Sequence, residues 1–197
     1  MHRMLRLTAV AALVAVPLSV NAQDMAPRPV SFGISAGLSM PMGDLGNALS
    51  SGFNVTGHVG YRPAMFTNLS FRGDVSFDRF NAKDEIGAIS QEGTFTAIGV
   101  SANAIYSFPQ ADASALTRPY LLGGLGFYNG KNSYTQTLGT GPAVEVSTSD
   151  SNMGLQAGAG VDFNLSGLTT FAEIKFVNVF GDGGSSRWVP ISFGIRF

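Results

Sequence analysis

The chain ends in the stretch Ile191-Ser192-Phe193-Gly194-Ile195-Arg196-Phe197, in which apolar residues alternate with small or polar ones and the last residue is aromatic. Alternation with a period of two is typical of a β-strand with one apolar face. An exposed edge strand of this kind would promote aggregation of a soluble domain. A strand that closes a sheet within a lipid bilayer needs this pattern, because its apolar face contacts lipid. The stretch therefore predicts a membrane β-strand.

Seven earlier segments share this alternation, which gives eight predicted strands. The first is the clearest, because every even-numbered residue from Val30 to Met40 is apolar and every odd-numbered one is Ser or Gly. Each segment is long enough to cross the apolar layer, which takes ~9–11 tilted residues. We find no helical periodicity in residues 23–197, so an all-β fold is predicted. The segments cover residues 30–40, 53–62, 69–78, 94–108, 120–128, 152–165, 168–177 and 187–197.

The connections between these segments are alternately longer and shorter over most of the chain. Transmembrane barrels have short periplasmic turns and longer external loops, and an even number of strands places both termini on the periplasmic side. The longest connection is 129–151. Tyr134, Val144 and Val146 within it favour a hairpin that continues the fifth and sixth strands beyond the membrane.

The start of the chain predicts a secretory signal peptide over residues 1–22. Arg3 and Arg6 are followed by an apolar stretch from Leu7 to Val20, and cleavage is expected after Ala22. The remaining residues 23–197 form one predicted domain. Removing the signal peptide leaves ten basic and thirteen acidic residues, a net charge of −3. This charge argues against a nucleic-acid partner, which would require a basic stripe.

The composition is unusual for a soluble domain of this size and leaves two classes, a soluble all-β domain and a membrane β-barrel. Only 13% of the residues are charged, compared with about 25% in typical soluble domains. The chain contains no cysteine, one histidine after cleavage and no clustered metal ligands. No cofactor and no metal site are therefore expected.

Aromatic residues gather near the predicted strand ends, which favours two aromatic girdles at the membrane interfaces. The predicted periplasmic girdle contains Tyr61, Phe66, Tyr106, Phe108, Tyr120 and Phe197, and the external one contains Phe53, Phe77, Phe80, Tyr128, Phe180 and Trp188.

Several motifs, in this order and spacing, resemble the eight-stranded outer-membrane β-barrel family that includes the OmpA transmembrane domain, OmpX and the opacity-type proteins. They are Pro41-Met42-Gly43-Asp44-Leu45 and the stretches 118–128, 155–163, 171–176 and 189–197. The resemblance implies an eight-stranded antiparallel up-and-down transmembrane β-barrel in the outer membrane, reached through the periplasm.

The same resemblance implies a set of partners. These are the outer-membrane lipid bilayer and lipopolysaccharide, periplasmic chaperones, and the barrel-assembly machinery. That machinery would read the C-terminal signal as a β-strand added to a sheet edge. We also expect a monomer with an unknown extracellular ligand of the loops. The assembly signal consists of Ile191, Phe193, Ile195 and Phe197.

Charged residues lie on the predicted inner face, where they must be paired or solvated. The interior of an eight-stranded barrel is just wide enough for side chains to fill it. We therefore expect a structural ion-pair network, with a narrow pore gated by partner exchange at Glu173 as the alternative. The network is predicted to contain Arg72, Asp74, Asp78, Glu173, Lys175 and Arg196; His58, Arg62 and Asp162 also point inward.

No residues point to catalysis. Some eight-stranded outer-membrane barrels act on lipid A, and a hydrolase of that kind needs a nucleophile next to a base. The residue two positions after His58 on the same face is Gly60 rather than serine. We therefore expect a non-enzymatic protein with a structural or surface-interaction role. The alternatives are a small diffusion channel, a lipid A-modifying enzyme and a soluble lipocalin-like barrel with an apolar interior.

Overall fold

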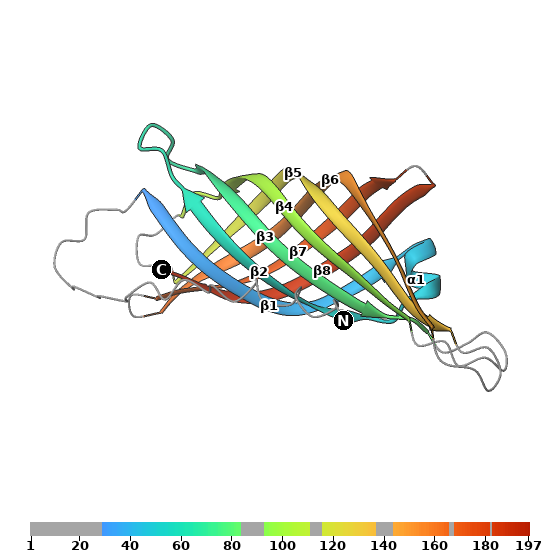
Figure 1. The fold of residues 1–197 in the computed structure, drawn as a ribbon. Helices are drawn as coiled ribbons and strands as arrows, with labels where there is room; N and C mark the ends of the chain where they lie inside the picture. Colours follow the sequence, from blue (N-terminus) through green and yellow to red (C-terminus); the bar gives the residue numbers. More distant parts are fainter. Residues whose placement is uncertain (1–28, 84–92, 111–115, 137–143, 166–167, 182) are drawn as a thin grey trace, which may run out of the picture.

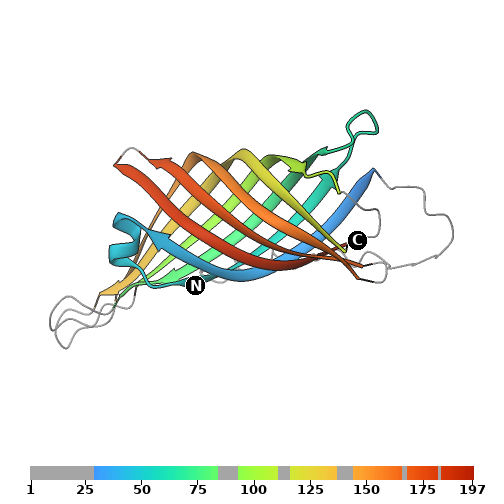
Figure 2. The same cartoon turned by 180° about the vertical axis from the view of Figure 1, so that it is seen from behind.

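The computed structural model describes residues 29–83, 93–110, 116–136, 144–165, 168–181 and 183–197, so the predicted signal peptide lies outside the described residues. Within these described ranges, eight strands and one short helix follow one another along the sequence (Figures 1 and 2). They are β1 (Val30–Met42), α1 (Asp44–Ala48), β2 (Gly52–Tyr61), β3 (Leu69–Asn81), β4 (Gly93–Ser107), β5 (Thr117–Gln136), β6 (Val144–Leu165), β7 (Leu168–Gly181) and β8 (Gly184–Arg196).

The strands form a closed barrel in which each is antiparallel to the next and β8 pairs with β1. The chain terminus takes part in this closure. The Phe32 amide donates to the Phe197 carbonyl at 2.8 Å, and the Phe197 amide donates back to Phe32 at 2.9 Å. Closure leaves no unpaired sheet edge, as a bilayer requires. The predicted eight-stranded up-and-down barrel is confirmed.

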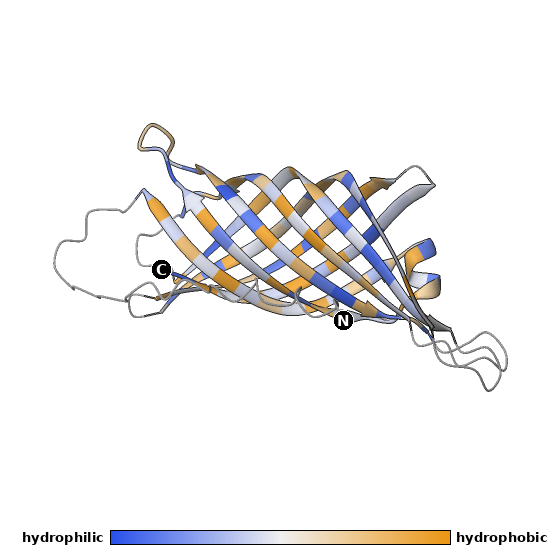
Figure 3. Cartoon of the chain, viewed as in Figure 1, coloured by the Kyte–Doolittle hydropathy of each residue, from blue (hydrophilic) through white to orange (hydrophobic). Residues whose placement is uncertain are grey.

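The outer face of the barrel is apolar and the inner face is mainly polar. Figure 3 shows hydrophobic and hydrophilic positions alternating along the strands. Leu38, Val100 and Phe193 are exposed outside, whereas Arg72 and Glu173 are buried inside. The predicted alternation of an apolar outer face with a polar inner face is confirmed, and Leu122 on β5 is an apolar residue that points inward. The lipocalin-like alternative, which requires an apolar interior, is wrong.

Different segments of the chain lie at the two ends of the barrel, and each end is named after its segments. The terminal end holds the start of β1 and the end of β8, and the loop end holds α1 and the hairpin of β5 and β6 (Figure 1). No helix among the described residues is both long and apolar enough to cross a membrane.

Two sequence predictions about the loop end need correction or extension, and a third is confirmed. A helix, α1, occupies a connection for which no helical pattern was found. It follows Gly43, whose φ of 60° is in the region that glycine favours. The strands β7 and β8 run on to a tight hairpin at Gly181 and Gly184, well beyond their predicted ends. The predicted continuation of β5 and β6 is confirmed, since they remain paired as far as Gln136 and Val144.

The prediction of aromatic girdles is wrong for four residues. Tyr120, which was assigned to the periplasmic girdle, is buried inside the barrel. Phe80, Tyr128 and Trp188, which were assigned to the external girdle, are also buried inside. Each of the four occupies a position of its strand that alternates inward. The interior has room for a large ring where a neighbouring inward residue is glycine, as Gly160 is beside Tyr120. The remaining aromatics of both girdles are outward or intermediate in exposure.

The lipid-facing surface makes a quantitative prediction. Replacing Val100 by arginine, near the middle of β4, should lower the free energy of unfolding by about 2–4 kcal/mol, because a charge would face the bilayer centre. Thr94→Arg is the matched control, because it lies on the same face near the loop end and should cost about 0–1 kcal/mol. Urea unfolding of the protein in lipid vesicles measures both. Equal costs would show that Val100 does not lie deeper in the bilayer than Thr94.

Candidate functional site: the barrel interior

Four charged side chains form a neutral cluster across the lumen, called here the charge quartet: Arg72, Asp74, Glu173 and Lys175. The guanidinium of Arg72 donates to Asp74 at 2.8 and 3.0 Å, and to Glu173 at 2.7 and 2.9 Å. The Lys175 Nζ lies 3.6 Å from Asp74 and 3.7 Å from Glu173. All four side chains are almost completely buried. Two cations thus balance two carboxylates away from bulk water.

The quartet joins opposite walls of the barrel. Arg72 and Asp74 come from β3 and Glu173 and Lys175 from β7, and four strand steps separate β3 from β7 in either direction around the barrel. Alternation along each strand predicted that these residues point inward. It could not predict which of them meet across the lumen.

A hydrogen-bonded chain extends from the quartet toward the loop end. Asn103 donates to Asp74 at 3.1 Å. Gln156 donates to the Asn103 side-chain oxygen and to Ser101 at 2.8 Å, and it accepts a hydrogen bond from Tyr128 at 3.2 Å. On the other side, the Tyr120 hydroxyl donates to Glu173 at 2.8 Å. The quartet is therefore embedded in a network in which polar groups satisfy one another.

The other two predicted members of the network lie elsewhere. Asp78 accepts a hydrogen bond from Ser39, which in turn accepts one from Asn54 at 3.2 Å. Arg196 pairs with Asp162 at 3.0 Å at the terminal end, and its guanidinium carbon lies 5.1 Å from the ring centroid of Phe171. The six predicted residues thus divide among three places rather than forming one network.

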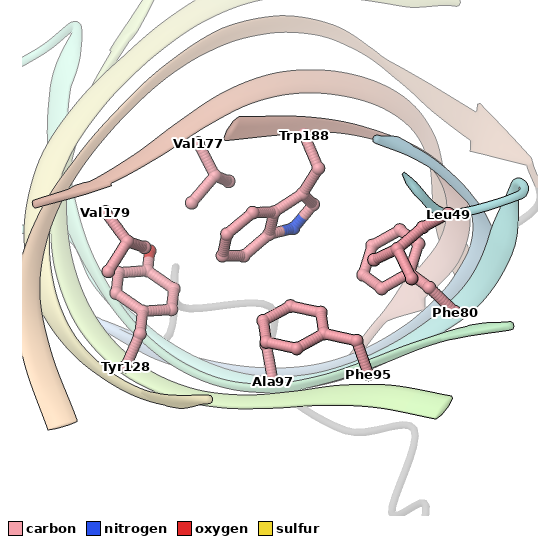
Figure 4. Packing of buried hydrophobic residues seen from close by; sticks show 8 residues of the cluster. All are labelled: Leu49, Phe80, Phe95, Ala97, Tyr128, Val177, Val179 and Trp188. Carbon is pink, nitrogen blue, oxygen red and sulfur yellow. The ribbon is translucent and has the colours of Figure 1, made fainter. Parts of the chain in front are cut away.

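An apolar cluster, called here the aromatic plug, fills the lumen between the charge quartet and the loop end (Figure 4). Trp188 lies at its centre and packs edge-on against Phe80 and Tyr128, with ring centroids 6.4 and 5.7 Å away. Leu49, which follows α1, packs onto the cluster. The alternation along each strand could have identified these residues. Phe80 is an even number of positions from Arg72 and Asp78 on β3, and Trp188 is an even number of positions from Arg196 on β8, so each faces the same side as those inward residues. The plug consists of Leu49, Phe80, Phe95, Ala97, Tyr128, Val177, Val179 and Trp188.

The filled middle leaves two separate cavities. One of about 630 Å³ opens at the loop end above Tyr128 and Trp188. The other, of about 810 Å³, lies at the terminal end, and Arg72 and Tyr120 contribute to its lining. The two cavities share no lining residue. The charge quartet and the aromatic plug pack in the lumen between these two cavities.

The remaining predicted inward residues carry no recognisable catalytic arrangement. His58 is buried with its ring edge toward Phe171, at a centroid distance of 5.4 Å, and its Nε2 has no hydrogen-bond partner among the described residues. Arg62 was predicted to point inward on the second strand; it follows the end of β2 and is exposed, and it lines the mouth of the terminal-end cavity rather than the packed lumen. Within the described ranges, no three potential metal ligands come together.

The closed sheet, with its apolar exterior and its charged, filled interior, defines a membrane-spanning β-barrel. The model of the family described as outer membrane protein beta-barrel domain matches residues 8–197, and the chain belongs to this family. The protein is accordingly an integral β-barrel of the outer membrane. No curated protein compared with the chain matches it.

Three solved structures share this fold. Neisserial surface protein A is 22% identical with a TM-score of 0.56, covering 85% of this chain and 96% of its own. Ail, the attachment invasion locus protein of Yersinia pestis, is 20% identical with a TM-score of 0.51, covering 85% and 97%. A major outer membrane protein from Thermus thermophilus is 13% identical with a TM-score of 0.54, covering 85% and 98%. At these identities the likeness concerns the fold.

The charge quartet predicts a large and non-additive loss of stability. Arg72→Gln should lower the free energy of unfolding by about 3–5 kcal/mol, because Asp74 and Glu173 lose their closest cation inside the lumen. Lys175→Gln should cost less, since its Nζ contacts are longer. The double variant Arg72→Gln with Glu173→Gln should cost less than the sum of the single changes. Urea unfolding in vesicles measures the series, and additive losses would show that the quartet is not coupled.

Proposed function

We propose that the protein acts at the cell surface through the segments at the loop end, and that the filled barrel serves as their rigid membrane anchor. This proposal includes the orientation expected from the sequence, with the terminal end in the periplasm. The observation that carries it is the interruption of the lumen by the charge quartet and the aromatic plug. A barrel without a continuous aqueous path suits a scaffold better than a conduit.

The β5–β6 hairpin offers the most extended surface for such a role. Phe127 and Met153 are its last large apolar outward residues before the loop end. Beyond them the outward positions are polar, and Asn129 donates a hydrogen bond to Ser151 at 2.9 Å. A polar paired ribbon of this kind projects into water rather than lipid, and loops on a rigid scaffold commonly carry recognition.

Cell adhesion tests this role. Residues 132–148 would be replaced by Asn-Gly, which closes a two-residue turn because Lys131 and Ser149 are already paired. Bacteria that display the intact protein should adhere to surfaces coated with heparin or matrix proteins, and the shortened variant should lose this gain. Heparin is included because a second Ail structure was solved with the heparin analogue sucrose octasulfate. Met65→Ser, at the terminal end, is the control; equal adhesion by all strains would contradict the proposal.

A narrow gated pore is the second candidate, because Glu173 lies within reach of two cations, Arg72 and Lys175. If Glu173 changed its ion-pair partner from Arg72 to Lys175, the side chains of the charge quartet would move in the middle of the lumen. We expect no regular single-channel steps from the intact protein in planar bilayers. Steps whose frequency changes in Glu173→Gln would favour the pore over the scaffold.

The C-terminal residues are proposed to engage the barrel-assembly machinery as well as closing the sheet. Phe197 faces outward and exchanges two backbone hydrogen bonds with Phe32. Deleting Phe197 should lower the yield of folded protein in the outer membrane. Heat-modifiable mobility on gels of membrane fractions measures that yield, and Phe193→Leu, which keeps the alternation, serves as the control. An unchanged yield after deletion would count against the signal.

A further inference from the structure

The cavity at the terminal end, called here the terminal vestibule, carries an excess of positive charge. Three arginines line it, namely Arg62 after β2, Arg118 on β5 and Arg196 on β8, in addition to Arg72 of the quartet. Asp162 is the one side-chain carboxylate of the described lining, and Phe197, which also lines the cavity, carries the C-terminal carboxylate. Since Arg72 is already bound by Asp74 and Glu173, the remaining groups amount to three cations and two anions, an excess of one positive charge.

The hydrogen-bonding capacity of these arginines is only partly used. Arg196 is bound to Asp162 at 3.0 and 3.1 Å. Arg118 donates to the Asn68 side chain at a long 3.4 Å, and its buried Nε has no partner among the described residues. A buried guanidinium N–H without a partner is costly, and a ligand that accepts a hydrogen bond would remove this cost.

The three cations also repel one another. Partial burial and the charges of Arg118 and Arg196 lower the pKa of Arg62, and Asp162 offsets this only in part. Asp162 and the three arginines all line the same cavity, so they face one common space. An anion entering that space would relieve the repulsion of several groups at once.

We propose that the terminal vestibule binds a phosphate group. Guanidinium groups match phosphate oxygens in geometry and form charge-assisted hydrogen bonds with them. One negative charge on the phosphate would balance the excess positive charge of the lining. The cavity of about 810 Å³ lies within the usual range for small-molecule sites. The phosphate could come from a soluble molecule or from a lipid headgroup of the adjacent leaflet, and this site is independent of the surface role proposed above.

Calorimetric titration of the full folded protein in lipid-free zwitterionic micelles, at constant ionic strength, tests the soluble source. Inorganic phosphate and pyrophosphate should bind saturably, with one site per chain.

Arg118→Gln should weaken the affinity about tenfold or more, because a charge-assisted hydrogen bond is lost. Arg62→Gln, in an exposed turn, should weaken it as well. Asp162→Asn should tighten it, since a competing anion is removed. Arg79→Gln, at the loop end, is the matched control and should bind like the intact protein.

Native mass spectrometry from nanodiscs tests the lipid source. If the headgroup is the ligand, phosphatidylglycerol remains bound to the intact protein and is lost from Arg118→Gln, while free phosphate does not bind in micelles. Heat-modifiable mobility confirms folding of each variant. The proposal is overturned if neither form of phosphate binds saturably, or if Arg62→Gln and Arg118→Gln bind it as tightly as the intact protein.

Discussion

The need to satisfy every backbone hydrogen bond within lipid governs this molecule. An open sheet would present unpaired amides and carbonyls to the hydrocarbon, where no water can bind them. The pairing of β8 with β1 removes that edge, and the reciprocal hydrogen bonds of Phe32 and Phe197 extend it to the last residue. Once the sheet is closed, alternate side chains must face either lipid or a narrow lumen. The apolar surface and the crowded interior both follow from that division.

The interior combines two ways of filling space. Near the loop end, Trp188 and its neighbours exclude water by apolar packing. In the middle, charged groups are tolerated because each carboxylate of the quartet has a cation within ion-pair distance. Tyr128 belongs to the apolar cluster and also donates to Gln156, so the two regions are continuous. The packed side chains of the quartet and the plug therefore lie between the terminal vestibule, with its unbalanced arginines, and the loop-end cavity.

Much of this arrangement follows from the sequence, and the exceptions have identifiable physical causes. A period of two defines the strand faces, so the inward direction of Arg72, Glu173 and even Leu122 could be predicted. The helix α1 could not, because five residues that include Gly46 and Asn47 are too few and too poor as helix formers to produce a period. The inward position of Trp188 conflicted with the average preference of aromatics for membrane interfaces, and its strand parity was the better guide. Partners such as Arg72 and Glu173 depend on distances across the lumen, which no pattern along a single strand contains.

The position of the quartet on opposite walls has a consequence for the order of folding. Arg72 and Asp74 on β3 reach Glu173 and Lys175 on β7 only when the intervening strands curve around and meet. A half-formed sheet would carry these four groups without their cross-lumen partners, and they would retain bound water. Closure, dehydration of the lumen and formation of the quartet should therefore occur together, late in folding. The ion pairs of the quartet thereby stabilise the closed barrel relative to intermediates in which the sheet is still open.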